Sequence, residues 1–282
     1  MKAYISVDLE GVNGVIHSSQ TQPNEPGYLR SLDLMHQETN AVIEGLLEAG
    51  CDEILINDSH WDMRNLQHEK LLQHPGVMVR SGWQKPFSMV SGIDKAPDRA
   101  DFAIFLGYHA RAGHEHGVLS HTYRAQIFYE VKLNDLPAGE TLLNAALAGY
   151  FDVPVALLCG DDTVCKEATD QLGPILTACV KTAVSRYSAI FPSHKETLSL
   201  LKAKAKEAAS NKKYWQVFKP KTPCKLEISF FDPSMADAAE LIPQIKRIGA
   251  RTIVIEGQDY SQIFRLMLAV GALGASRKDP YF

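Results

Sequence analysis

Short apolar runs alternate with stretches of helical periodicity over the first 160 residues. Between the first two runs, residues 32–49 place Met35, Val42 and Leu46 on one helical stripe, and Gly50 follows as a C-cap. Such a β-α-β unit places its two strands in parallel with the helix across one face. We therefore predict an α/β fold with a mostly parallel sheet flanked by helices. The apolar runs that we take as buried strands are residues 4–7, 53–57, 102–106 and 153–158.

The segment between the last two runs has a different pattern. Residues 126–133 alternate between apolar and polar, Asn134 and Asp135 form a turn, and a helix is expected over residues 140–150. We interpret the alternating part as a β-hairpin beside the main sheet.

The character of the chain changes near residue 190. A helix rich in lysine and alanine is expected over residues 193–213, and a loop with two prolines follows it. We therefore divide the chain into an α/β domain, residues 1–190, and a smaller C-terminal α+β domain, residues 191–282. The elements expected after the loop are a strand at 226–230, a helix at 234–242, a strand at 252–256 and a helix at 259–273.

Composition and charge argue against several classes of protein. The chain has 282 residues, 45% of them hydrophobic and 22% charged, which is typical of a folded globular protein. Its net charge of -4 provides no basic field for nucleic acid. No apolar stretch is long enough to span a membrane or to serve as a signal peptide. Five cysteines without a CxxC pair indicate reduced thiols, so we expect a cytoplasmic protein with no nucleic-acid or membrane partner.

Polar side chains follow four of the predicted strands. Because the carboxyl ends of parallel strands meet at one edge of a sheet, these side chains are expected around one crevice. Asp8 and Glu10 stand two residues apart, so in an extended chain they point to the same side; alternatively they cap a helix or meet arginines. Carboxylates with histidines are a recurrent ligand set for Zn²⁺. The residues at the strand ends are Asp8 and Glu10, Asp58 and His60, His109, and Asp161 and Asp162, with Glu140 nearby at a helix start.

Seven short segments, in order, resemble the D-aminopeptidase family of the bacterial dipeptide-transport operon type. The resemblance is strong over about the first 190 residues and weaker beyond. It implies a zinc-dependent metallo-aminopeptidase that removes N-terminal D-amino acids such as D-Ala from short peptides. It also implies a ring-stacked homodecamer whose active sites face an internal channel. The segments are SVDLEGVNG from Ser6, NDSH from Asn57, KPFSMVSG from Lys85, FLGYHARAG from Phe105, GVLSH from Gly117, PAGE from Pro137 and CGDD from Cys159.

The resemblance also implies the roles of individual residues. The catalytic histidine falls on His121 in GVLSH, and the site holds two zinc ions per subunit. The family's metal ligands fall on Asp8 and Glu10 in DxEG, His60 in NDSH, His109 in GYH and Glu140 in GE.

As a hypothesis, two zinc ions bridged by Asp8 activate a water molecule and polarise the amide carbonyl. His121 then acts as base, nucleophile or oxyanion donor. We expect Asp58, Asp161 and Asp162 to support the ligands from outside, because metal-bound imidazoles commonly donate their other N–H to a carboxylate or carbonyl. His114 and His116 depart from the family loop, where they touch substrate, bind stray metal or face solvent.

Three alternatives stay open at this point. A dinuclear hydrolase of phosphoesters or of other amides would keep the metals and change the substrate. A non-catalytic component of a transport system would bind peptides or metal without turning them over. A cysteine hydrolase would use Cys159, beside Gly160 and Asp161.

Overall fold

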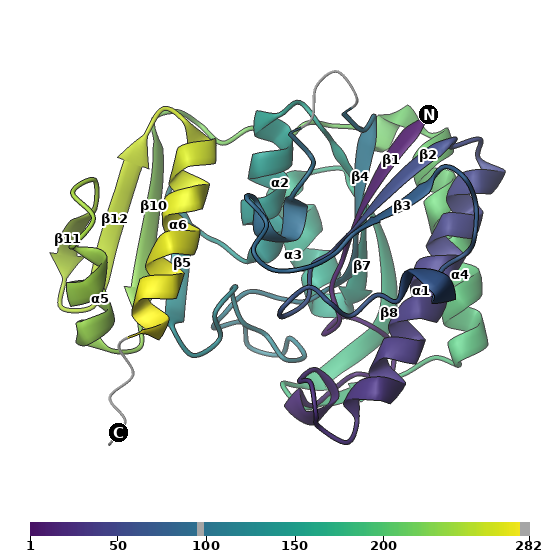
Figure 1. Cartoon of the computed structure of the whole chain (residues 1–282), viewed down its shortest axis with the longest axis horizontal. Helices are drawn as coiled ribbons and strands as arrows, with labels where there is room; N and C mark the ends of the chain where they lie inside the picture. The colour runs from purple at the N-terminus through teal and green to yellow at the C-terminus, as the bar shows by residue number, and fades with distance from the viewer. Residues whose placement is uncertain (95–98, 277–282) are drawn as a thin grey trace.

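A seven-stranded sheet forms the centre of the larger part of the molecule (Figure 1). The computed structural model describes residues 1–94 and 99–276. The strand order is β3-β2-β1-β4-β7-β8-β9, and all neighbours are parallel except β8 and β9. The predicted α/β class with a mostly parallel sheet is confirmed. The strands are β1 (Lys2–Val7), β2 (Glu53–Asp58), β3 (Val77–Arg80), β4 (Phe102–Tyr108), β7 (Val155–Asp161), β8 (Leu176–Ser185) and β9 (Ser188–Ile190).

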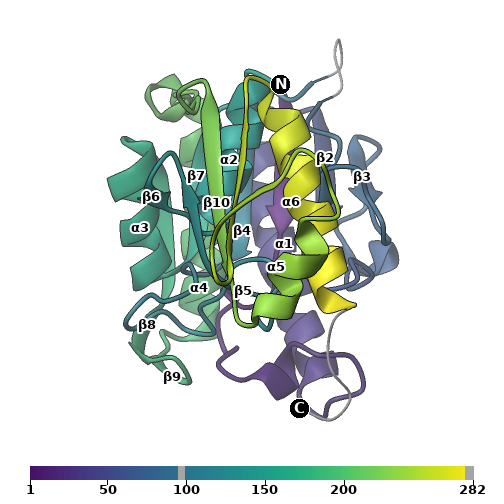
Figure 2. The ribbon, with the colours of Figure 1, turned by 90° about the vertical axis from the view of Figure 1, so that its left-hand side faces the viewer.

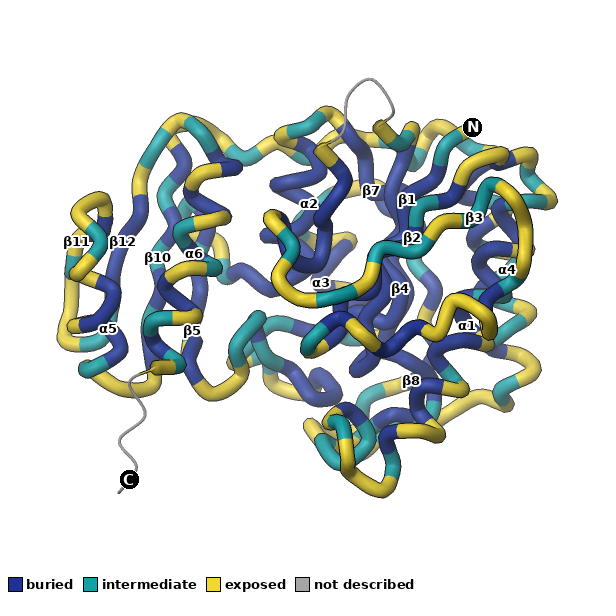
Figure 3. The backbone as a smooth tube through the Cα atoms, viewed as in Figure 1, coloured by how far each residue is buried: buried dark blue, intermediate teal, exposed yellow. Residues whose placement is uncertain are grey.

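Helices cover both faces of this sheet. On one face, α1 (Tyr28–Glu48) packs against α4 (His194–Ser210), and both share a core with Ile5 of β1. On the other face, α2 (Glu140–Tyr150) and α3 (Asp162–Leu172) share a core with Tyr4. Adjacent residues of β1 thus enter opposite cores, because successive side chains of a strand point to opposite faces. Covered on both faces, β1 and β4 are buried almost throughout (Figure 3).

A second, antiparallel sheet lies in front of the first when the molecule is turned by 90° (Figure 2). Its order is β11-β12-β10-β5-β6, and α5 and α6 pack on it. The hairpin expected from residues 126–133 and the turn at 134–135 exists, and its strands pair within this second sheet rather than with the main sheet. The elements are β5 (Phe128–Leu133), β6 (Leu136–Pro137), β10 (Cys224–Phe230), α5 (Pro233–Ala239), β11 (Lys246–Gly249), β12 (Thr252–Gly257) and α6 (Tyr260–Ala275).

The two sheets do not follow a single boundary in the sequence. Strand β5 comes from the middle of the chain, whereas α4 follows residue 190 and packs on α1. One continuous core runs from the face of the main sheet with Tyr4 through Leu142 of α2 to Phe264 of α6 and Ile228 of β10. The division at residue 190 stays a prediction about domains.

Smaller features complete the description. All five cysteines are free, and only Cys179 is exposed. None of the helices within the described ranges is long and apolar enough to cross a membrane. In the part of the chain that the structure describes, 3-10 turns lie at Ser18–Gln20, His68–Lys70, Ser88–Val90 and Lys212–Tyr214.

Candidate metal centre

The ends of β1 and β4 approach each other more closely than side chains would allow. The backbone N–H of Asp8 donates to Leu106 O at 2.8 Å, and that of Gly11 donates to Gly107 O at 2.7 Å. A Cβ on Gly11 would lie 2.1 Å from Tyr108 O, and one on Gly107 would lie 2.2 Å from Asp8 O. The two glycines therefore permit the contact that brings the loop after β1 beside His109.

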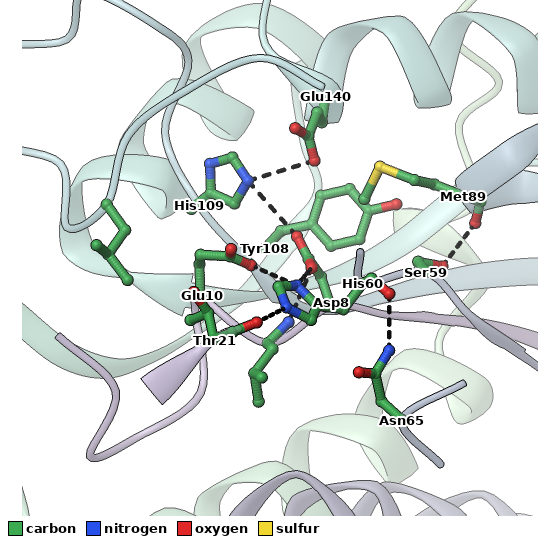
Figure 4. Close-up of polar contacts among 12 residues, drawn as sticks. Asp8, Glu10, Thr21, Ser59, His60, Asn65, Met89, Tyr108, His109 and Glu140 are labelled. Carbon is green, nitrogen blue, oxygen red and sulfur yellow. Dashed lines mark hydrogen bonds and ion pairs between the residues drawn. The ribbon is translucent and has the colours of Figure 1, made fainter. Parts of the chain in front are cut away.

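The first half of the site forms around the loop after β1. Asp8 and Glu10 lie at the end of β1, and His60 lies at the end of the neighbouring β2. His60 Nδ1 lies 3.1 Å from Asp8 Oδ1 and 3.0 Å from Glu10 Oε2. Figure 4 shows both carboxylates directed at this ring. The two acidic groups are thus not helix caps or arginine partners.

The second half of the site adds the residue directly after β4, the first residue of α2 and a residue of a loop. His109 Nε2 lies 3.5 Å from Asp8 Oδ2 and 3.3 Å from Glu140 Oε2 (Figure 4). Glu140 is the first residue of α2, and its other oxygen lies 3.7 Å from His121 Nε2. Asp8 therefore lies between His60 and His109, and Glu140 lies between His109 and His121. All six predicted site residues are brought together in one place.

Each imidazole is oriented by a backbone carbonyl. The remaining ring N–H donates from His60 Nε2 to Thr21 O at 2.6 Å, from His109 Nδ1 to Ala110 O at 3.0 Å, and from His121 Nδ1 to Leu119 O at 2.8 Å. These bonds fix the tautomers, so that the other nitrogen of each ring faces the carboxylates.

None of the three expected supporting aspartates contacts a site imidazole, so that part of the hypothesis is wrong. Asp58 accepts from the backbone N–H groups of Asn65 and Leu66. Asp161 caps α3 at Val164 N and accepts from Val118 N, and Asp162 accepts from Ala183 N. These carboxylates shape loops, whereas carbonyls hold the rings. A carbonyl such as that of Thr21 carries no signature in the sequence.

Burial makes the charges of the site interdependent. Desolvation and the neighbouring charge of Glu10 raise the pKa of Asp8 to about 7. Burial alone would lower the pKa of His109, but Glu140 and the other carboxylates raise it to about 10. For Glu10, His60 outweighs the effect of burial and holds the pKa well below its usual range. The buried carboxylates therefore require positive charge beside them.

The residues fit a bound metal ion. His109 Nε2 is buried, makes no hydrogen bond and lies between the carboxylates of Asp8 and Glu140, which hold a proton on the ring where a metal ion would take its place. Two groups of three ligand atoms lie within 4.8 Å of one another, Asp8 with Glu10 and His109, and His109 with His121 and Glu140. Imidazole nitrogen and carboxylate oxygen are the donors that zinc uses in catalytic sites. The geometry could hold more than one ion around His109.

The remaining expectations have different outcomes. Cys159 is fully buried in the core under α1 and α4, and burial raises its pKa well above the usual range, so the cysteine-hydrolase alternative is wrong. His116 is exposed beside Glu115, whereas His114 is half-buried with Nδ1 unpaired. Within the described residues, neither joins a group of three ligands.

Sequence analysis missed a polar network beneath the ligands. Tyr108 Oη lies 2.7 Å from Ser6 Oγ and accepts from Asn144 Nδ2 at 3.0 Å. Ser6 Oγ also meets Ser59 Oγ at 2.8 Å, and both hydroxyls reach Met89 O. The network connects β1, the end of β2, β4 and α2. Its members Ser6, Ser59 and Tyr108 precede the ligands Asp8, His60 and His109 in the sequence by one or two residues. The one signal in the sequence is Ser6, a polar residue within the otherwise apolar run at residues 4–7.

A buried carboxylate–imidazole centre at the carboxyl edge of a parallel sheet is the kind of site that a metal-dependent hydrolase uses. A family model described as D-aminopeptidase matches residues 1–269, and the chain belongs to this family. It is 38% identical over 276 residues to a D-aminopeptidase of Bacillus subtilis (strain 168), covering 97% of each chain. A solved structure, the Zn-dependent D-aminopeptidase DppA from Bacillus subtilis, described as a self-compartmentalizing protease, matches with a TM-score of 0.92. That match has 37% identity and covers 99% of both chains.

Proposed function

We propose that this chain is a zinc-dependent aminopeptidase that releases N-terminal D-amino acids, such as D-Ala, from short peptides and amides. The observation that carries the proposal is the buried Nε2 of His109, which makes no hydrogen bond and lies between Asp8 and Glu140 inside a cluster of carboxylates and imidazoles. Membership of the D-aminopeptidase family and the match to a zinc-dependent member support the substrate class.

We assign Asp8, Glu10, His60, His109 and Glu140 as ligands of two zinc ions. When bound, zinc supplies a Lewis acid that polarises the scissile carbonyl and offsets negative charge developing on it. The imidazoles are held for this task by Thr21 O and Ala110 O, and the carboxylates lie 3.0 to 3.5 Å from the ring nitrogens. The ligand atoms of these side chains already face one another, so the side chains need not be rearranged when zinc binds.

We assign His121 as the catalytic residue. Burial and the adjacent charge of His109 lower the pKa of His121, so its ring is neutral near pH 7 and can accept a proton. Its Nδ1–H is held by Leu119 O, which leaves Nε2 as the acceptor on the side of Glu140. We propose that this nitrogen moves the proton that hydrolysis transfers to the leaving amine.

We further propose that the protein forms a homodecamer in the cytoplasm. The matched structure belongs to a self-compartmentalizing protease. Around the β8–β9 hairpin, Val184, Tyr187 and Ile190 are more than half exposed, an apolar surface that self-association would cover. Five free cysteines support a reducing compartment. Light scattering should give the mass of about ten 31.2 kDa chains; the mass of a single chain would contradict the assembly.

The substrate proposal is tested with a matched set of chromogenic compounds. Zinc-loaded protein should release p-nitroaniline from D-Ala p-nitroanilide at least about tenfold faster than from the L isomer. Hydrolysis of bis-p-nitrophenyl phosphate alone would favour a phosphoesterase. Binding of D-Ala peptides without release of any product would favour the transport-component alternative.

A further inference from the structure

Strand β8 contributes no residue to the metal centre, yet a cation on it and a cation directly after it reach two of the segments that carry site residues, the loop of Glu10 and the segment of His121. Lys181 lies within β8, and Arg186 follows its last residue, Ser185. Figure 1 shows β8 beside β7, on the far side of β7 from β4. Both side chains donate to backbone carbonyls, Lys181 as a buried ammonium and Arg186 from an exposed position.

Lys181 is 1% exposed, and its Nζ lies among three carbonyl oxygens of the loop after β1. It donates to Glu10 O at 2.5 Å, to Val12 O at 3.0 Å and to Val15 O at 2.7 Å. A protonated ammonium has three N–H donors, so donors and acceptors match one to one. Without the ammonium, the loop would bury three carbonyls that converge on one point with no donor, which is destabilising.

Arg186 holds the segment that carries His121. Its Nη1 donates to Ser120 O and, at 2.9 Å, to Ser120 Oγ. Its own carbonyl accepts from the N–H of Leu119 at 2.9 Å. Leu119 adopts a positive φ of 50° and provides the carbonyl that orients His121, so the contacts with Arg186 stabilise a strained turn directly at the ring.

Neither cation is explained by an ion pair. Across residues 1–94 and 99–276, the hydrogen bonds of the Lys181 ammonium and the Arg186 guanidinium all go to carbonyl or hydroxyl oxygens, and neither group forms an ion pair within 4 Å. The nearest polar partners of Lys181 are the carbonyls of the Glu10 loop, and Arg186 additionally donates to Tyr187 Oη at 3.2 Å. The carboxylates of Asp161, Glu38 and Glu10 act on the ammonium only from beyond contact distance, so its direct partners are the three carbonyls.

We propose that Lys181 and Arg186 are positioning residues of the metal centre: Lys181 fixes the loop that presents Glu10, and Arg186 fixes the turn that presents His121. This rests on the proposed function, in which Glu10 is a ligand and His121 moves the proton. Partners outside the ligand sphere typically change metal affinity or activity by about 10- to 100-fold when they are removed. The two cations should act on different quantities, because they hold different loops.

For Lys181, the readout is zinc affinity, which needs no turnover. Lys181→Met removes the donors and keeps the length of the side chain, and it should weaken zinc binding, measured by competition with a chelator, about 10-fold or more. Amide exchange at residues 9–16 should accelerate. Lys166→Met, an exposed change on α3, should alter neither.

A second variant keeps the Lys181 test decisive if the methionine variant does not fold. Lys181→Arg retains the charge but presents a planar fork of donors to three converging carbonyls. It should also weaken zinc binding and accelerate exchange at residues 9–16. Wild-type zinc affinity and exchange in a folded Lys181 variant would overturn this half of the proposal.

For Arg186, the readout is the division between kcat and KM together with exchange in the His121 segment. Arg186→Met should lower kcat about 10-fold or more, with KM and zinc content unchanged, and accelerate exchange at residues 118–122. Arg186→Lys should restore part of kcat, because one donor can still reach Ser120 O. Arg30→Met, exposed on α1, is the matched control.

The outcomes separate this inference from the proposed function. If wild-type protein binds zinc but releases no D-residue, the proposed function fails, while the zinc-affinity and exchange measurements still test the positioning roles. If the wild-type protein is active and both Lys181→Met and Arg186→Met match it in affinity, kcat and exchange, the inference is wrong and the proposed function stands.

Discussion

His109 and His121 lie ring on ring, with centroids 4.0 Å apart and planes 11° from parallel. Two imidazolium rings in such contact would repel each other, so the positive charge settles on one of them. Burial and the charge on His109 lower the pKa of His121, whereas the carboxylates raise that of His109. Two chemically identical side chains therefore differ in role: His109 keeps the proton that a bound metal ion would displace, and His121 stays a neutral proton acceptor at the edge of the site.

Replacing His121 by Ala should lower turnover of D-Ala p-nitroanilide about 100-fold or more, because a positioned acid–base group contributes about that much. Zinc content, measured by elemental analysis, should stay at the wild-type level. His68→Ala, an exposed histidine far along the chain, is the control. Full zinc with unchanged turnover would remove His121 from the chemistry.

Asp8→Asn should reduce zinc content and turnover together. The carboxylate faces both His60 and His109, and an amide of the same shape offers a weaker ligand with no charge. Elemental analysis and the p-nitroanilide assay give the two quantities. Asp170→Asn, in an exposed pair with Lys166, should leave both unchanged. Retention of full zinc content by Asp8→Asn would contradict the ligand assignment.

Glu38 should make stability depend on pH. It is fully buried on α1, one oxygen accepts from Asn13 N–H and the other has no partner, and burial raises its pKa to about 8. The folded chain keeps this proton between about pH 4.5 and 8, whereas the unfolded chain has lost it. The stabilisation is therefore complete below pH 4.5 and lost as pH rises to 8, a change of a few kcal/mol.

Glu38→Gln removes this titration. Thermal unfolding of the variant and the wild type, followed from pH 5 to 8.5, should give curves that diverge, with the variant gaining stability relative to the wild type as pH rises. Parallel curves would show that Glu38 titrates normally in the folded chain.

Alanine substitutions at two glycines with positive φ distinguish the cost of a steric clash from the cost of backbone strain. Gly107 has a φ of 72° and a Cβ there would lie 2.2 Å from Asp8 O, whereas Gly173 has a φ of 82° with no atom within 4 Å. Gly173→Ala should cost about 1 to 3 kcal/mol from strain alone. Gly107→Ala should cost several times more and abolish zinc binding, because the ends of β1 and β4 must separate. Equal losses in thermal unfolding would contradict this account.

The sequence was most informative where chemistry stands at the end of an apolar run. Asp8, His60 and His109 each follow a buried strand, and parallel pairing brings the strand ends together whatever the intervening segments do. The position of His121 came from the resemblance, because it lies on a loop without periodicity. Helix 140–150 was predicted correctly, with Glu140 at its first turn.

Other features could not be predicted, for identifiable reasons. The hairpin at 128–137 pairs with β10, about 90 residues away, and alternation does not specify a partner strand. Strand β8 was not expected, since Lys181 is a charged residue in a position that is buried and packed. Its ammonium satisfies carbonyls of residues 10, 12 and 15, and backbone acceptors leave no trace in a sequence.

The most direct test of the account is zinc content measured together with turnover through one cycle of chelation and restoration. The purified protein should hold about two zinc ions per chain and release p-nitroaniline from D-Ala p-nitroanilide. Removal of the metal should abolish release, and added zinc should restore it. Release that persists in metal-free protein, or protein that binds no zinc at all, would contradict the central claim.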